Sequence, residues 1–252
     1  MHRLFVFFCA ILFLFSCNQH LVVREVNTKN ISVDSKVGSL DSVIESMVKP
    51  YRDSIGNDMN TLVAISSSAL IKGKPESKLT NLMSDILLEF GTSYCLKQNL
   101  NTRPDVAYVN YGGLRASLPK GEITVERIFE LMPFENEVVM IKMTGASFLL
   151  MAEKIAGRGG EGVAGMKLGI RNGKMSSLTS GGKPINPTAF YWLITSDYIA
   201  NGGDQMSMFL NPVERINTKM KIRDLLIQAL GDQYKRDGKI DVKEDGRIFN
   251  EQ

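Results

Sequence analysis

The sequence predicts an α+β fold in which helices cover a mixed sheet. Segments whose apolar residues recur at helical spacing alternate with short apolar runs that are typical of buried strands. These strand-like runs occur in both halves of the chain, and no sequence repeat recurs at a fixed period. Hydrophobic residues make up 44% of the 252 residues, an ordinary share for a globular protein, so the chain can bury a core.

The N-terminus predicts an export signal that ends in a lipidation site. A basic start precedes an apolar run over residues 4–15, which is shorter than the roughly 20 residues of a membrane-spanning helix. The tetrapeptide Leu-Phe-Ser-Cys that ends at Cys17 resembles the bacterial lipobox. We therefore expect a cleaved signal peptide over residues 1–16 and an exported protein, lipid-anchored to a bacterial envelope membrane and facing the periplasm or the cell surface. The alternative is an ordinary signal peptide with a chance cysteine.

Residues 17–38 predict a tether between the lipid and a folded domain. They mix Asn, Ser, Thr, Val and Lys without helical periodicity. A single domain is expected over residues 39–252. With Cys9 removed and Cys17 acylated, Cys95 is the one thiol left, so no internal disulfide is expected.

The first half of the domain begins with a predicted helix. Ser39 or Asp41 is its expected cap, because apolar residues between 40 and 48 fall on one helical face. Residues 80–96 carry the longest amphipathic pattern of the middle, and Cys95 beside its apolar face is expected to be a small core residue. The other expected elements are strands over residues 61–66 and 106–109 and a helix that Thr124 caps and Pro133 ends.

The second half is expected to alternate in the same way. Residues 137–143 alternate in polarity as a strand does, and residues 145–155 follow with helical spacing. Further strands are expected at residues 166–170, 177–179 and 191–195, and an amphipathic helix over residues 218–230 is expected to close the domain.

Charge and histidine content bear on two classes of function. The formal net charge is +3, and Lys and Arg are scattered among Asp and Glu without a basic stripe, so no nucleic-acid partner is expected. A two-metal phosphoesterase needs several histidines and carboxylates that converge on one site. The two histidines are His2, which leaves with the signal, and His20, close to the lipid. We therefore expect no catalytic residues, no metal ligands and no cofactor in this chain, and leave open whether it is an enzyme.

A glycine-rich string at residues 157–162, Gly-Arg-Gly-Gly-Glu-Gly, satisfies the pattern G-x-G-x-x-G. In dinucleotide-binding folds that pattern follows a strand and begins a helix. Here it follows a predicted helix and precedes a predicted strand. We interpret it as a flexible helix-to-strand loop.

The segment after the predicted strand at residues 106–109 carries the first candidate ligand-binding residues. Gly112 and Gly113 allow the backbone to approach a ligand and to take positive φ. Asn110 precedes them, and Arg115 offers a planar fork suited to an anion or a carbonyl edge. The alternative is a turn with a surface arginine.

Two further loops complete the candidate site. Residues 198–204 combine Tyr198, a glycine pair and Asp204, and residues 132–136 place Phe134 in a rigid loop. Two aromatic rings can sandwich a base, and a carboxylate can accept hydrogen bonds from ribose hydroxyls. If the loops converge, their side chains suit a nucleoside.

Four motifs give the chain a family resemblance. They are Asn-Tyr-Gly-Gly-Leu-Arg at residues 110–115, Gly-Glu-Ile-Thr at 121–124, Pro-Phe-Glu-Asn at 133–136 and Asn-Gly-Gly-Asp at 201–204. In this order they resemble the motifs of the C-terminal domain of 5′-nucleotidases, over residues 62–210. In that family the C-terminal domain holds the substrate, and a separate N-terminal metallophosphoesterase domain carries two metals and hydrolyses the phosphate. The resemblance implies a layered α/β/β/α sandwich.

The resemblance also implies roles for individual residues. Phe134 and Tyr198 match the two aromatics that stack the base, with Tyr198 in place of the more usual phenylalanine. Asp204 matches the ribose-binding aspartate, and Asn110 and Arg115 match the polar pair that meets base and phosphate. The expected substrate-binding residues are Asn110, Gly112, Gly113, Arg115, Phe134, Tyr198, Asn201, Gly203 and Asp204.

Two departures from the family pattern bear on function. The family often has an arginine ahead of a Gly-Asn-Leu helix start, whereas residues 72–82 hold no arginine and have Thr80 where glycine is usual, which bears on phosphate binding there. The larger departure is that the sequence shows no metallophosphoesterase domain.

Three hypotheses for function follow. In the first, the chain is the nucleotide-recognising half of a split 5′-nucleotidase, and a separate metallophosphoesterase chain supplies the divalent metals. In the second, it alone captures nucleosides or nucleotides at the envelope. In the third, it is a degenerate scaffold. An exposed apolar patch beside the Asn110 and Asp204 loops would favour the first, a closed polar rim the second, and loss of the gap between Phe134 and Tyr198 the third.

Overall fold

The structure is a computed structural model that describes residue 28 and residues 41–251. The expected signal peptide over residues 1–16, Cys17, the tether apart from residue 28, and the expected domain start at residue 39 lie outside the described residues. The chain divides into two compact units between Lys49 and Pro50. The second unit contains every strand and the candidate site of the described part.

Helix α2 (Ser42–Met59) begins where the sequence predicts a helix. The Asp41 carboxylate caps it by accepting hydrogen bonds from the backbone N–H groups of Val43 (2.9 Å) and Ile44 (3.2 Å). The apolar side chains from Val43 to Ile55 are nevertheless largely exposed, and none of the residues of α2 is buried. Within the described part of the chain, no helix is long and apolar enough to span a membrane.

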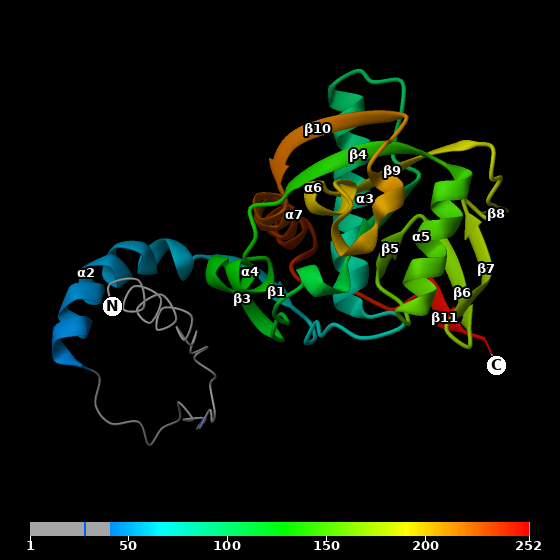
Figure 1. Cartoon of the computed structure of the whole chain (residues 1–252). Coiled ribbons are helices and arrows are strands. Elements are labelled where there is room, and N and C mark those ends of the chain that lie inside the picture. The colour runs from blue at the N-terminus through cyan, green and yellow to red at the C-terminus, as the bar shows by residue number, and fades with distance from the viewer. Residues whose placement is uncertain (1–27, 29–40, 252) are drawn as a thin grey trace, which may run out of the picture. The chain divides into compact units, whose positions relative to one another are not determined.

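A five-stranded mixed sheet forms the centre of the second unit (Figure 1). Its strand order is β10-β4-β9-β2-β5, in which β9 pairs in parallel with β2 and antiparallel with β4. The strands are β2 (Val106–Val109), β4 (Glu137–Thr144), β5 (Gly162–Ala164), β9 (Phe190–Ser196) and β10 (Glu214–Lys221). A separate antiparallel pair joins β1 (Leu62–Ser66) to β3 (Gly121–Thr124).

A four-stranded sheet is connected to the five-stranded sheet by the chain, because β5 of one leads directly into β6 of the other. Its order is β11-β6-β7-β8, and β11 pairs in parallel with β6. The strands are β6 (Met166–Arg171), β7 (Lys174–Ser180), β8 (Lys183–Pro184) and β11 (Ile248–Asn250).

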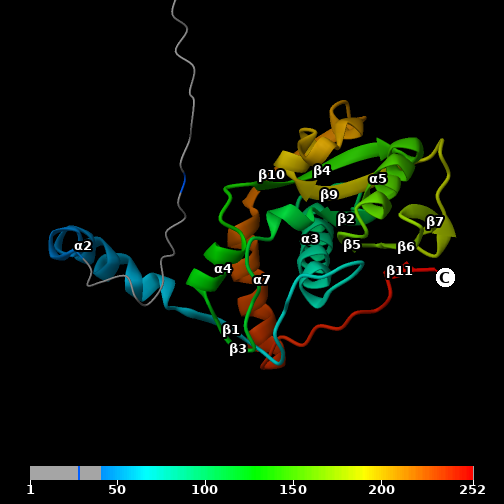
Figure 2. The ribbon, with the colours of Figure 1, turned by 60° about the horizontal axis from the view of Figure 1, so that its bottom comes forward.

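Helices and the second sheet cover the two faces of the five-stranded sheet, as Figure 2 shows. On one face lie α3 (Lys78–Lys97) and α7 (Ile222–Asp237), with α4 (Val125–Leu131) packed against α7. On the other face lie α5 (Gly145–Gly157), the four-stranded sheet and the short helix α6 (Asp197–Ala200). The predicted α+β class with a mixed sheet is confirmed.

Each face of the sheet has its own core. The first core joins α3 and α7 to the sheet and includes Cys95, whose Sγ lies 3.7 Å from the Sδ of Met140. Burial raises the pKa of the Cys95 thiol, which is a core residue as predicted. The second core joins the opposite face to α5 and the four-stranded sheet, with Tyr108 and Phe148 fully buried in it.

The predicted elements agree with the structure apart from the start of the closing helix, the short helix α6 and five strands. Thr124 stands at the N-cap position of α4 as predicted, but its side chain makes no capping hydrogen bond. The helix expected over residues 218–230 is α7, which begins only at Ile222, because residues up to Lys221 belong to β10, the strand beside β4. Strand β4 is expected to alternate in polarity, but four consecutive residues are buried because both of its faces are covered. Strands β3, β5, β8, β10 and β11 were not predicted.

Candidate functional site

Three loops meet at one edge of the five-stranded sheet because of its strand order. Strands β2 and β9 are parallel neighbours, so the segments that follow them leave the sheet at the same edge. Strand β4 is antiparallel to β9, with Val138 opposite Ser196, so the segment that precedes β4 also reaches that edge. A cavity of about 400 Å³ lies there, lined by Asn110, Gly112, Gly113, Arg115, Phe134, Asn136, Tyr198 and Asp204.

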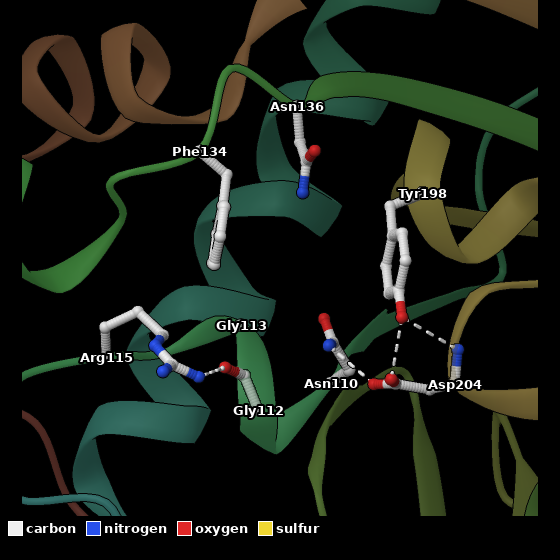
Figure 3. Close-up of a pocket in the computed structure, with 8 residues that line it drawn as sticks. All are labelled: Asn110, Gly112, Gly113, Arg115, Phe134, Asn136, Tyr198 and Asp204. Carbon is white, nitrogen blue, oxygen red and sulfur yellow. Dashed lines mark hydrogen bonds between the residues drawn. The ribbon is translucent and has the colours of Figure 1, made fainter. Parts of the chain in front are cut away.

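Phe134 and Tyr198 stand on opposite sides of this cavity, with an open gap between their rings (Figure 3). Both rings remain partly exposed, at 41% for Phe134 and 45% for Tyr198. Helix α6 places Tyr198 there, since the Ser196 hydroxyl caps the helix by accepting a hydrogen bond from Ile199 N–H. Asn136 lies between the two rings at one end of the gap.

The Asp204 carboxylate is held on the Tyr198 side of the cavity. Asn110 Nδ2 donates to Asp204 Oδ2 at 2.7 Å, and the Tyr198 hydroxyl donates to Asp204 Oδ1 at 2.9 Å. The same hydroxyl accepts a hydrogen bond from Asp204 N–H at 3.2 Å. The Tyr198 hydroxyl therefore fixes both its own aromatic ring and the Asp204 carboxylate.

The glycines of the site are needed for close contacts more than for unusual backbone angles. Neither Gly112 nor Gly113 uses the positive φ that a glycine allows, because both lie in a short 3-10 turn, η2 (Tyr111–Gly113). A Cβ atom on Gly113 would lie 2.8 Å from Asn110 Oδ1, and a Cβ on Gly203 would lie 2.5 Å from the Tyr198 ring. Side chains at these two positions would displace site residues.

Positive charge gathers around the η2 turn. Arg115 is exposed and donates from Nη1 to the Gly112 carbonyl at 3.1 Å. The ammonium groups of Lys72 and Lys74 lie 4.3 and 5.0 Å from the centre of the Tyr111 ring. Burial, and then the charge of Arg115, lowers the pKa of Lys72. Residues 72–74, which hold no arginine, thus bring two cations to this turn.

Seven of the nine predicted substrate-binding residues line the cavity, and two do not. Asn201 is exposed and ends helix α6, where its side-chain oxygen accepts a hydrogen bond from Arg215 Nη1 at 2.7 Å. Gly203 lies against the Tyr198 ring, which leaves no room for a side chain at position 203. Asn136 lines the cavity although it is absent from the predicted set. Its place in the Pro-Phe-Glu-Asn motif is the signal that points to it.

The loop that carries Phe134 is anchored by ion pairs of the next residue, Glu135. Lys221 and Arg223 both donate to its carboxylate. These hydrogen bonds, that of Lys221 first and then that of Arg223, lower the pKa of Glu135 to about 2. The Arg223 guanidinium also lies 4.0 Å from the centre of the Phe129 ring. The Phe134 loop is therefore tied to the start of α7.

The chemistry of the cavity lining is that of a binding site for a flat polar ligand. Among the described residues, Asp204 is the one carboxylate that lines the cavity, and both of its oxygens already accept hydrogen bonds. This set of donors does not fit a pair of divalent metals. Residues 41–251 contain no group of three or more His, Cys, Asp or Glu side chains that could hold a metal ion.

Comparisons with known proteins agree with the resemblance. A family model described as the 5′-nucleotidase C-terminal domain matches residues 56–211. A 5′-nucleotidase of Vibrio vulnificus (strain CMCP6) is 24% identical over 208 residues, which are 81% of this chain and 36% of that protein. An apyrase of Tabanus yao is 25% identical over 86% of this chain and 43% of its own length. The chain thus spans less than half the length of these relatives.

A solved structure shows the same fold. The 5′-nucleotidase precursor from Thermus thermophilus superposes with a TM-score of 0.70 and 21% identity, over 82% of this chain and 43% of that one. This likeness confirms the predicted layered α/β/β/α type of fold. The matched family segment contains every residue of the cavity lining.

Proposed function

Because the chain belongs to the family of 5′-nucleotidase C-terminal domains, we propose that the cavity between Phe134 and Tyr198 binds the nucleoside part of a nucleotide. The observation that carries this proposal is the pair of aromatic rings on opposite sides of an open gap, with a carboxylate at one side (Figure 3). The volume of the whole cavity, about 400 Å³, lies within the range of small-molecule sites. An open gap also speaks against a collapsed, degenerate scaffold.

Each polar group of the lining has a matching group in a nucleotide. A base between the rings gains stacking energy of about 1–3 kcal/mol on an aromatic side chain. The Asp204 carboxylate is an acceptor for ribose hydroxyls, and Asn110 and Asn136 carry amide donors and acceptors for the base edge. Arg115, on the Phe134 side, offers two parallel N–H donors to a phosphate.

We further propose that the chain works as the nucleotide-recognising half of a split 5′-nucleotidase at the cell envelope. A separate metallophosphoesterase chain would supply the divalent metals and the hydrolysis, and the lipidated Cys17 would hold this half at the membrane. Exposed Leu210, which lies against Gly202 beside the Asp204 turn, and exposed Val213 support a partner surface there.

The second candidate is a lipoprotein that captures nucleosides or nucleotides without a partner. The nearly complete hydrogen bonding of Asp204 favours it, because the site is already ordered within this chain. The two candidates share the nucleoside site. They differ in whether a phosphoesterase completes it.

Calorimetric titration of residues 18–252 with adenosine and AMP tests the shared site. We expect Phe134→Ala to weaken adenosine binding roughly 5- to 100-fold through lost stacking, and Asp204→Ala to weaken it by a similar factor. Phe190→Ala, which removes an exposed ring at the other end of β9, is the matched control and should leave the affinity unchanged. Arg115→Gln should weaken AMP and spare adenosine.

Failure of the native chain to bind either ligand would remove the solitary-binder candidate. Equal losses in Phe134→Ala and Phe190→Ala would show that the cavity is not the site. The partnership is tested by purifying the native chain from its own cells and measuring whether a phosphoesterase activity copurifies with it. Leu210→Asp and Val213→Asp should abolish this copurification. A phosphoesterase that stays bound to these variants would contradict the proposed surface.

A further inference from the structure

The glycine-rich loop at residues 157–162 is a packed part of the molecule and not the flexible connection that the sequence suggests. It does join helix α5 to strand β5, as expected. Gly160, with φ of +107°, has no room for a side chain, because a Cβ there would lie 2.1 Å from the Pro75 carbonyl oxygen. Lys74 Nζ donates to the Arg158 carbonyl from the same segment. The loop is therefore clamped against residues 74–75.

Two charged residues of this loop, Arg158 and Glu161, form a network with Tyr108. Arg158 pairs through Nη1 with Glu161 Oε1 at 3.1 Å, and the same nitrogen lies 3.4 Å from the Tyr108 hydroxyl. The Tyr108 hydroxyl donates to the other oxygen of Glu161. Glu161 is only 5% exposed and Tyr108 is fully buried. Burial, followed by the charge and hydrogen bond of Glu161, raises the pKa of Tyr108 well above its ordinary value, so Tyr108 remains a donor.

The remaining arm of Arg158 reaches the site, since its Nη2 donates to the backbone carbonyl of Asp204. That carbonyl lies in an unusual turn, because Asp204 (φ +50°) and Gln205 (φ +61°) both adopt left-handed backbone angles. For residues other than glycine this conformation costs about 1 kcal/mol or more per residue. Such a turn persists only where the surrounding structure stabilises it. The Arg158 guanidinium does so by a hydrogen bond to the carbonyl of Asp204, the first of the two strained residues.

We propose that Arg158 is a positioning residue for Asp204, with Glu161 and Tyr108 as its buried support. By fixing the carbonyl of the strained turn, Arg158 orients the Asp204 carboxylate toward the cavity. This assignment rests on the proposed function, because the consequence is discrimination for the hydroxyl groups of a bound ribose. Figure 3 shows the Asp204 carboxylate beside Asn110 and Tyr198.

Hydrogen exchange of the purified, ligand-free protein tests the positioning role directly. In Arg158→Gln we expect the amides of residues 203–206 to exchange at least tenfold faster than in the native protein. The matched control is Arg171→Gln, which removes the exposed ion pair between Arg171 on β6 and Glu251. In this control the amides of residues 203–206 should exchange at the native rate. Native exchange in Arg158→Gln would overturn the proposal. If that variant does not fold, Arg158→Lys replaces it, because one ammonium cannot reproduce the planar fork between Glu161 and Asp204.

Ligand discrimination provides a readout that a general loss of stability would not change. The native protein is expected to bind adenosine more tightly than 2′,3′-dideoxyadenosine, and Arg158→Gln should bring the ratio of the two dissociation constants close to one, as Asp204→Ala does. Binding of the dideoxy compound should stay within about twofold, and adding Arg158→Gln to Asp204→Ala should change nothing further.

The assignment would be overturned if Arg158→Gln lost affinity equally for adenosine and the dideoxy compound. It would also be overturned if this variant kept the native ratio of the two dissociation constants. If the native protein binds neither nucleoside, the proposed function fails, and the exchange measurement still decides whether Arg158 holds the turn.

Discussion

Phe134 and Asp204 stand on opposite sides of one cavity, and different kinds of contact hold them. The Asp204 side rests on Arg158, Glu161 and Tyr108, a network in which the acid and the phenol are buried. The Phe134 side rests on the exposed carboxylate of Glu135, which pairs with exposed Lys221 and with buried Arg223.

Exposed ion pairs contribute little and are screened by salt, whereas removing one member of a buried network leaves its partners unsatisfied. We infer that the carboxylate side is preformed and that the Phe134 side adjusts to the ligand. Four measurements test this difference between the two sides.

Gly160→Ala should have the largest effect, because the new Cβ would collide with the Pro75 backbone at a position with φ of +107°. We expect a loss of about 3 kcal/mol in the free energy of unfolding, measured by urea denaturation. Gly173→Ala is the matched control, with φ of +72° and nothing within 4 Å, and should cost about 1 kcal/mol. Similar losses in the two variants would show that the clamp behind Asp204 is not rigid.

Gly203→Ala should have the second-largest effect, as a disturbance of Tyr198. Its Cβ would lie 2.5 Å from the Tyr198 ring and 2.6 Å from the Tyr198 carbonyl oxygen, so Tyr198 must shift from its native position. We expect adenosine affinity to fall about tenfold by calorimetry, because the ring can no longer face Phe134 at the native spacing. Gly181→Ala, in open space between β7 and β8, should keep the native affinity. A native affinity in Gly203→Ala would mean that the Tyr198 side is also adjustable.

Arg223→Gln should have a smaller effect, on the Phe134 side. Arg223 is 8% exposed, packs on Phe129 and pairs with Glu135. We expect about 1–2 kcal/mol of lost stability, roughly threefold weaker adenosine binding and faster hydrogen exchange over residues 133–136. Arg236→Gln, which removes an exposed pair on the same helix, is the control. A loss of affinity as large as that of Gly203→Ala would remove the distinction between the sides.

Glu135→Gln should have the smallest effect, visible as a change with pH. The pKa of Glu135 is lowered to about 2 in the folded protein, so its ion pairs stabilise the fold above the ordinary pKa of about 4.3 and lose that contribution as pH falls toward 2. The difference in melting temperature between the native protein and Glu135→Gln should therefore narrow from pH 5 to pH 2.5. A constant difference over this range would contradict the assignment.

Most of the fold could be predicted because its long elements bury one regular face. Residues 80–96 repeat apolar side chains at helical spacing, and α3 packs that face into the first core. Strand β10 was missed because its exposed edge position allows a polar sequence, from Glu214 to Lys221, that lacks an apolar pattern. The same polar run made the start of α7 ambiguous.

The site divides in the same way. The ordered motifs predicted Phe134, Tyr198 and Asp204 together, and the parallel pairing of β2 with β9 explains why their loops converge. The place of Arg158 could not be predicted, because its role depends on a contact with a carbonyl 46 residues further along the chain. A local pattern of glycines and charges carries no information on that distance.

The C-terminal segment has a consequence for how the molecule is completed during synthesis. Residues 214–250 supply β10, α7 and β11, which are the outer strand of one sheet, a cover of the first core and a strand of the other sheet. Since the ribosome makes these residues after the other helices and strands of the described part, both cores stay open until the chain has passed Asn250. Both sheets and both cores are thus completed by the same late segment of the chain.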